Sequence, residues 1–231
     1  MKNACLKINS IIAHDLRDSL SSISGISDIL INNWDAFSKE EKFEILEEIK
    51  ETSDSTMRLL SDLLDWGKQV AEISEMEKKI FNAECVVNTM IEISQAKSKR
   101  KNLEITNLVP SACSVFGDEN MFAAIVRNLL ANSIKSCINA GKIIVNAEHT
   151  GSLIRFSVTD NGIGMTKSQI DRLFPDNENT ANQSVPEAYN NGFGLILCRD
   201  FVKINGGTLW AESEEGIGTS VFFTFPEATI S

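Results

Sequence analysis

The chain has 231 residues, a hydrophobic content of 42% and a formal net charge of −10, enough apolar material for one large domain or two modest ones. The negative charge argues against a nucleic-acid or anionic-membrane surface, because both need clustered Lys and Arg. Five scattered cysteines and only two histidines argue against a zinc site and favour a reduced, cytoplasmic protein. No secretory signal is visible, and no apolar run is long enough to cross a membrane.

Residues 1–72 are predicted to form two long amphipathic helices joined by a short loop. Apolar residues recur at three- and four-residue steps over residues 8–30 and again over residues 43–64. Ser38 and Glu41 match a capping box that would begin the second helix. The two helices are expected to pair as an antiparallel hairpin. The apolar stripe that a lone hairpin leaves exposed predicts a homodimer, in which two hairpins form a four-helix bundle.

His14 is expected beside the apolar stripe of the first helix and not within it. Leu16 and Leu20 follow it by two and six residues, whereas neighbours on a helix surface lie three and four residues apart. A solvent-exposed histidine is the simpler interpretation of this position. The alternative is a nucleophile, because the adjacent carboxylate of Asp15 can orient the imidazole and accept its proton.

A polar segment over residues 71–80 is predicted to link this hairpin to a second domain, so the domains are placed at 1–72 and 73–231. Beyond the linker the pattern mixes helices and strands, and the predicted fold class is α+β. A loop is expected where Asn, Pro, Glu and Ser concentrate, over residues 175–191. Helices are expected over residues 83–100, 119–139, 165–174 and 192–204, and strands over 103–108, 114–117, 142–148, 153–159, 208–213 and 219–225.

The sequence DNGIGM, Asp160–Met165, directly follows one of these predicted strands. A carboxylate at a strand end, followed by Gly-x-Gly, supplies a fixed hydrogen-bond acceptor beside a backbone with no Cβ in the way. Such a turn can approach a flat polar ligand closely. On these six residues alone, a plain turn between strands is the simpler interpretation.

Three further stretches accompany this motif: RNLLANSIK at Arg127–Lys135, NGFGL at Asn191–Leu195 and GIGT at Gly216–Thr219. In this order, behind a helix that carries His14 in HDLRDSL, they closely resemble the bacterial sensor histidine kinases of two-component signalling. The resemblance spans nearly the whole chain. It implies a dimerisation and phosphoacceptor hairpin, followed by an α/β sandwich of the histidine kinase and Hsp90-like ATPase type.

The resemblance also implies an activity, cofactors and partners. The expected reaction is ATP-dependent autophosphorylation of His14, with Asp15 as the proton acceptor, followed by transfer to an aspartate of a response regulator. ATP and Mg²⁺ are the expected cofactors. The expected partners are a second copy of the chain and a receiver domain, with a separate sensor domain or protein as a further one.

By the same resemblance, Asn132 binds Mg²⁺, while Asn128 and Lys135 lie on the triphosphate side. Asn128 and Asn132 are four residues apart and so share a helix face, and an amide oxygen is a suitable hard ligand for Mg²⁺. The helix that begins near Gly192, Gly194 and Leu195 can offer backbone N–H groups to phosphate oxygens.

The adenine pocket is implied to consist of four of the named positions. Asp160 accepts a hydrogen bond from the adenine amino group, Gly162 and Gly164 leave room for the base, and Thr219 closes the pocket. For Thr219, an ordinary β-branched strand residue remains the alternative interpretation.

The sequence departs from the family pattern in two places, at Asp18 and Ser19 and at Ser136. Asp18 and Ser19 stand where relatives carry Thr or Asn and then Pro, and a carboxylate there would repel an attacking anion. We therefore expect weak phosphatase activity towards the partner. Ser136 stands where many relatives place an aromatic ring beside the base, which predicts modest nucleotide affinity.

Two other functions are consistent with parts of the pattern. An ATP hydrolase of the same nucleotide-binding fold would need a glutamate four residues before Asn132, but this position is Asn128, whose amide cannot act as a base. A degenerate, nucleotide-binding dimeric scaffold that docks a response regulator without efficient kinase activity is the stronger alternative, because Asp18, Ser19 and Ser136 depart from the pattern.

Overall fold

The computed structural model describes residues 17, 19–72, 77–138, 140–174 and 194–228. The chain separates into two compact units, Met1–Asp65 and Trp66–Ser231. The domain boundary expected from the sequence, between residues 72 and 73, stays a prediction. No helix in the described part of the chain is long and apolar enough to cross a membrane.

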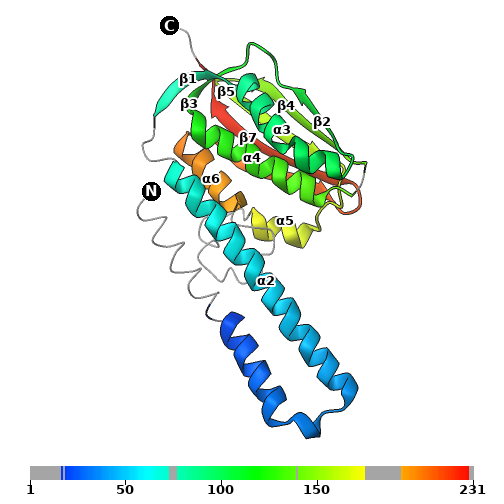
Figure 1. Cartoon of the computed structure of the whole chain (residues 1–231). Coiled ribbons are helices and arrows are strands. Elements are labelled where there is room, and N and C mark those ends of the chain that lie inside the picture. The colour runs from blue at the N-terminus through cyan, green and yellow to red at the C-terminus, as the bar shows by residue number, and fades with distance from the viewer. Residues whose placement is uncertain (1–16, 18, 73–76, 139, 175–193, 229–231) are drawn as a thin grey trace. The chain divides into compact units, whose positions relative to one another are not determined.

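The first unit consists of helices, as predicted. Residues 19–32 are helical, a 3-10 turn follows at Trp34–Ala36, and α2 covers Lys39–Glu72 (Figure 1). The predicted capping box is present: the Glu41 backbone N–H donates to Ser38 Oγ at 3.2 Å, and the Ser38 N–H donates to Glu41 Oε2 at 2.8 Å. These reciprocal bonds satisfy N–H groups that the start of α2 would otherwise leave unpaired.

The described part of this unit has almost no core of its own. Among its described side chains only Leu30 is buried. A chain that exposes this much apolar surface gains stability by covering it. The exposed apolar side chains lie on both helices and on the turn between them: Leu20, Ile29, Ile31, Trp34, Phe43, Leu46, Met57 and Leu60.

The second unit is a mixed α/β domain. Its elements follow in the order β1 (Lys78–Asn82), α3 (Ala83–Arg100), β2 (Glu104–Leu108), β3 (Ser114–Asp118), α4 (Glu119–Ser136), β4 (Lys142–Thr150), β5 (Leu153–Asp160), α5 (Lys167–Leu173), α6 (Gly194–Ile204), β6 (Leu209–Glu214) and β7 (Gly218–Pro226). Strand β1 begins inside the segment that was predicted to be a linker, so that prediction was wrong for Lys78–Ile80. The strand was missed because only Phe81 is buried in it, which leaves no alternating pattern.

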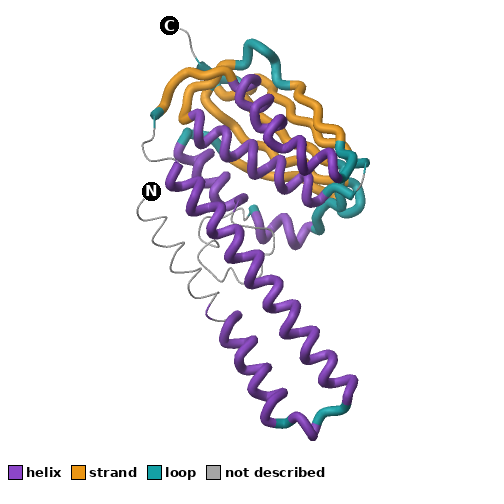
Figure 2. The backbone as a smooth tube through the Cα atoms, viewed as in Figure 1, coloured by secondary structure: helices purple, strands orange, loops and turns teal. Residues whose placement is uncertain are grey.

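The strands form two sheets. A five-stranded sheet has the order β2-β4-β5-β7-β6, and β1 pairs with β3 in a separate two-stranded sheet. Within the larger sheet only the β2–β4 pair is parallel. Helices α3, α4 and α6 lie side by side over one face of this sheet (Figures 1 and 2). The register places Asp160 of β5 directly opposite Thr219 of β7.

The core lies between these helices and the sheet, and Phe122 of α4 is at its centre. Its ring makes edge-to-face contacts with four other aromatic rings, those of Phe81, Phe156, Phe223 and Phe225, at centroid distances of 5.0–5.7 Å. Since these rings come from β1, β5 and β7, Phe122 joins helix α4 to both sheets.

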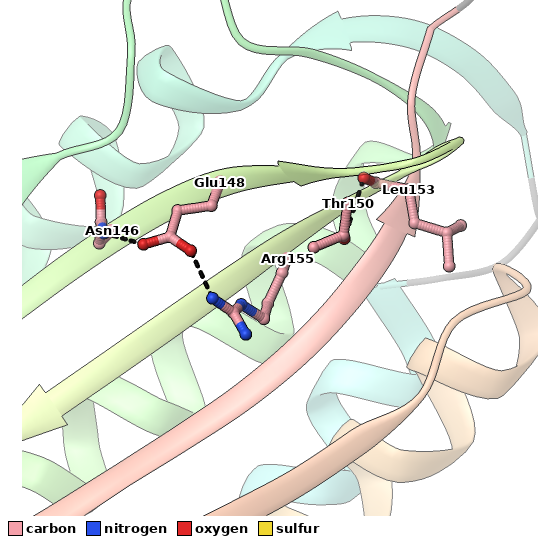
Figure 3. A network of polar contacts seen from close by, with 5 residues as sticks. All are labelled: Asn146, Glu148, Thr150, Leu153 and Arg155. Carbon is pink, nitrogen blue, oxygen red and sulfur yellow. Dashed lines mark hydrogen bonds and ion pairs between the residues drawn. The ribbon is translucent and has the colours of Figure 1, made fainter.

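The opposite face of the five-stranded sheet is partly exposed; its side chains on β4 and β5 are mostly polar, and Trp210 of β6 stacks on Phe222 of β7 there. Figure 3 shows its β4–β5 hairpin, where Arg155 forms an ion pair with Glu148 and the Asn146 amide donates to Glu148 at 3.4 Å. At the turn, Thr150 Oγ1 donates to the Leu153 carbonyl at 3.2 Å. Alternation of half-buried and buried residues along β5 therefore separates a partly exposed face from the face that the helices cover.

We expect Phe122→Ala to lower the free energy of unfolding of the second unit by about 3–5 kcal/mol, the range measured for deleting a large buried ring. The matched control is Phe116→Ala on β3, since that ring is 43% exposed and its removal should cost less than about 1 kcal/mol. Urea denaturation followed by circular dichroism measures both. Equal losses for the two variants would contradict the central place given to Phe122.

Candidate nucleotide-binding site

The residues predicted to hold the base meet where the C-terminal half of α4 faces the loop after β5. Asp160 is the last residue of β5 and is 7% exposed. Its Oδ2 accepts a hydrogen bond from Ser133 Oγ of α4 at 2.8 Å, and its Oδ1 accepts one from the Gly162 N–H at 3.0 Å. The Thr219 N–H also bonds to this carboxylate. Three donors from three segments therefore fix its orientation.

Burial raises the pKa of Asp160, because a charged carboxylate is poorly solvated there, and the bonds from Ser133, Gly162 and Thr219 oppose that rise. A carboxylate that accepts three hydrogen bonds still has about one further lone-pair direction. It can accept one more bond, from a ligand.

Two glycines of the DNGIGM motif lie close to protein backbone, and the room for a base that the sequence predicts there stays a prediction. A Cβ on Gly162 would lie 2.6 Å from the Ser136 carbonyl oxygen, and a Cβ on Gly164 would lie 1.9 Å from the Glu214 carbonyl oxygen. Gly164 also has φ +66°, a conformation that costs other residues energy. The motif therefore packs directly against the end of α4 and against the β6–β7 turn.

Thr219 is buried and its hydroxyl has a defined partner. Ser213 Oγ lies 2.8 Å from Thr219 Oγ1 and donates to the Gly218 carbonyl at 2.8 Å. The same Ser213 oxygen accepts the Met165 N–H at 2.8 Å. Thr219 is therefore part of a hydrogen-bonded group that joins the β6–β7 hairpin to the glycine motif.

The C-terminal end of α4 is held by a lysine from another element. Lys101 follows α3, and its Nζ donates to the carbonyls of Ile134, Lys135 and Cys137 at 2.8–3.1 Å. A cation at this helix end satisfies unpaired carbonyls and complements the helix dipole. The sequence analysis did not identify Lys101, nor Ser133 and Ser213, as site residues.

The residues predicted to lie near phosphate, where the structure describes them, are on α4 and at the start of α6. Asn132 is half-buried and Lys135 exposed, and both lie in the last two turns of α4. A Cβ on Gly194, the first residue of α6, would lie 3.2 Å from Asn128 Oδ1. The Asn128 amide also hydrogen-bonds to Cys198. The two asparagines thus share one helix face, with Asn128 packed against the first turns of α6.

Leu195 of α6 is buried, so it fills the core beneath this site. His14, Asp15 and Gly192 lie outside the described residues, as do Asp18 and the segment predicted as a loop over 175–191. Among the residues that the structure describes, no three His, Cys, Asp or Glu side chains are placed to hold a metal ion.

Comparison with protein families places this arrangement in a known class. Residues 117–229 match the family model described as histidine kinase-, DNA gyrase B- and HSP90-like ATPase, and residues 6–72 match the His kinase A (phospho-acceptor) domain. The second unit therefore has the ATP-binding fold of that class.

Curated histidine kinases match nearly the whole length of this chain. The chain is 28% identical to histidine protein kinase DivJ of Caulobacter vibrioides over 93% of its length and 36% of the relative's. It is 30% identical to the adaptive-response sensory kinase SasA of Synechocystis over 95% of its length and 58% of the relative's. The chain thus spans between about a third and three fifths of these two relatives.

Solved structures agree on the fold. Histidine kinase AdeS of Acinetobacter baumannii matches with a TM-score of 0.58 at 16% identity, covering 94% of this chain and 98% of that one. Histidine kinase ThkA, solved in complex with the response regulator protein TrrA, matches with a TM-score of 0.61 at 19% identity, covering 96% and 61%. The chain belongs to the sensor histidine kinases of two-component systems.

We expect Gly164→Ala to destabilise the second unit and weaken nucleotide binding, because the new methyl group would collide with the Glu214 carbonyl. The matched control is Gly151→Ala, which has nearly the same φ, +65°, but nothing within 4 Å of the added Cβ. In both variants, placing an alanine in the left-handed conformation should lower the free energy of unfolding by about 1–2 kcal/mol. Only Gly164→Ala should lose about 1–3 kcal/mol more through overpacking.

Thermal unfolding with and without ADP measures both variants. Identical shifts in melting temperature for the two variants would show that the close packing of Gly164 against the Glu214 carbonyl is not required for stability or nucleotide binding.

Proposed function

We propose that the chain is the catalytic core of a sensor histidine kinase that phosphorylates its own His14 from ATP and then passes the phosphoryl group to an aspartate of a response regulator. The observation that carries the proposal is the Asp160 carboxylate, which three hydrogen bonds hold on the face of the sheet that carries α4. A fixed, buried acceptor beside two closely packed glycines fits the amino edge of adenine.

The nucleotide would extend from Asp160 along α4 towards the start of α6. Backbone N–H groups at a helix N-terminus attract phosphate oxygens, and the first turn of α6 lies against Asn128. Lys135 is exposed and can reach phosphate as a point charge.

The residues present fit a magnesium ion. Mg²⁺ is usually held by one or two protein oxygens together with substrate phosphates, and the half-buried Asn132 amide offers such an oxygen on the face that Asn128 shares. When bound there, the ion would neutralise charge that develops on the transferred phosphoryl group.

The chemical step would use His14 as the nucleophile. A nitrogen of the neutral imidazole forms a bond to the γ-phosphorus while the bond from that phosphorus to the β–γ bridging oxygen breaks, and ADP leaves. The proton from the other imidazole nitrogen passes to Asp15. This reaction needs little covalent chemistry from the protein, so its rate would depend on positioning and charge.

The partners we propose follow from the first unit and from the relatives. Among the described apolar side chains of the first unit, one is buried and many are exposed. Helices of this kind gain stability by pairing with a second copy, so we propose a homodimer through residues 1–72. ThkA was solved with a response regulator, and a receiver domain is the corresponding partner proposed for this chain. Mg²⁺ dependence and a cytoplasmic location are part of the same proposal.

A nucleotide-binding scaffold without efficient kinase activity is the second candidate, favoured by Ser136. Its backbone carbonyl accepts the Ile163 N–H at 3.2 Å, but its small side chain offers no ring surface to the base. Phosphoprotein that is labile in acid and stable in base, formed with ATP and Mg²⁺, would distinguish the kinase from the scaffold.

We expect His14→Gln to abolish labelling by radioactive ATP while nucleotide binding stays unchanged, because the substitution removes only the acceptor nitrogen. His149→Gln is the matched control, since that imidazole lies near the end of β4, is exposed, and has its Nδ1 3.2 Å from Oε1 of Glu227, which follows β7. It should label like the wild type. Labelling that persists in His14→Gln would rule out His14 as the phosphoacceptor.

We expect Asn132→Ala to raise the Mg²⁺ concentration needed for half-maximal labelling by at least about tenfold. Removing even a group that only hydrogen-bonds to a metal ligand typically weakens metal binding by about that factor or more. Asn146→Ala removes an amide on the polar face of the sheet (Figure 3) and should leave the Mg²⁺ requirement unchanged. The two variants are compared by titrating Mg²⁺ at a fixed, saturating ATP concentration. An unchanged requirement in Asn132→Ala would remove Asn132 as the metal ligand.

A further inference from the structure

Ser133 donates its hydroxyl hydrogen in an unusual direction for a serine inside a helix. The hydroxyls of Ser27 and Ser94 donate to the backbone carbonyl four residues earlier, at 2.7 Å and 2.8 Å, the usual local choice. Ser133 instead donates across the helix–sheet boundary to Asp160 Oδ2 at 2.8 Å, and both residues are buried. Its hydrogen is therefore used to hold a carboxylate, and it cannot be offered to a ligand.

The hydrogens of Ser213 and Thr219 can be assigned by the same reasoning. A hydroxyl has one hydrogen, and the Gly218 carbonyl can only accept, so the Ser213 hydrogen points to Gly218. The 2.8 Å contact between the two hydroxyls must then use the hydrogen of Thr219. With the Met165 N–H as its other donor, the Ser213 oxygen is fully satisfied. Thr219 keeps only lone pairs for any other partner.

We propose that Ser133 and Ser213 are positioning residues that make the base pocket present acceptors only, through the Asp160 carboxylate and the Thr219 hydroxyl, and that this selects a purine bearing an amino group over one bearing a keto group. The inference rests on the proposed nucleotide binding and goes beyond it by naming two residues that would not touch the ligand.

The selectivity follows from the donors and acceptors on the two purine types. An exocyclic amino group brings hydrogens to both acceptors. A keto oxygen at the same ring position would face a carboxylate and the lone pairs of a hydroxyl, with no hydrogen between them. Buried polar groups left without partners are costly, and sites built in this way discriminate strongly between such analogues.

Ser133→Ala tests the first residue. We expect its affinity for ADP to fall about tenfold, the size of one lost hydrogen bond to a charged group. Its affinity for the diphosphate of purine riboside, which has no group at the amino position, should change little. The matched control is Ser94→Ala, which removes another buried helical hydroxyl and should alter neither affinity. Calorimetry at one Mg²⁺ concentration measures all three proteins.

Ser213→Ala tests the second residue. The substitution frees the Thr219 hydrogen, which could then be donated to a keto oxygen. We expect the ratio of ADP to inosine diphosphate affinity to fall severalfold, with inosine diphosphate binding more tightly than it does to the wild type. A purely structural role would weaken both nucleotides in parallel.

Parallel losses for all nucleotides in both variants, in protein that keeps the wild-type near-ultraviolet circular dichroism, would overturn the inference and leave nucleotide binding intact. Failure of the wild-type chain to bind ADP at all would instead overturn the proposed function. The two failures are therefore distinguishable in one set of titrations.

Discussion

The second unit depends on the contact between α4 and the sheet. At one end of this contact Phe122 packs among four aromatic rings from three strands. At the other, Ser133 bonds to Asp160. The first contact is apolar, so it adds stability but is non-directional. The second is polar and sets the orientation of the Asp160 carboxylate. A helix fixed at both ends in this way can hold Asn128 and Asn132 in a constant position relative to Asp160, as the proposed nucleotide site would need.

Most of the fold could be predicted because it follows local patterns. The alternation along β5, the capping box of Ser38 and Glu41, and the amphipathic run of α4 each determine an element without reference to the rest of the chain. The two-stranded sheet was not found, because β1 has one buried residue and is held by pairing with a strand some 36 residues away, Ile80 facing Phe116. Pairing over that distance leaves no periodic signal in β1 itself.

For the candidate site, sequence reasoning found the residues that belong to short motifs and missed those that only the fold brings near them. Asp160, Gly162 and Gly164 belong to one short motif, and the register places Thr219 opposite Asp160. Ser133, Ser213 and Lys101 act on residues that only the fold brings near them. Ser133 looked like an ordinary helical serine, and Lys101 like the basic end of α3, although its ammonium group binds the carbonyls at the end of α4. A signal for Ser133 was available, since a polar residue stood on the apolar face of α4 between Leu130 and Ile134.

The central claim of the proposed function is that the chain binds Mg·ATP against α4, the loop after β5 and the start of α6. The most direct test is calorimetric titration of the full chain with a non-hydrolysable ATP analogue, with and without Mg²⁺. The account predicts saturable binding at one site per chain that is stronger with Mg²⁺. The absence of binding heat, in protein whose near-ultraviolet circular dichroism shows a folded state, would contradict it.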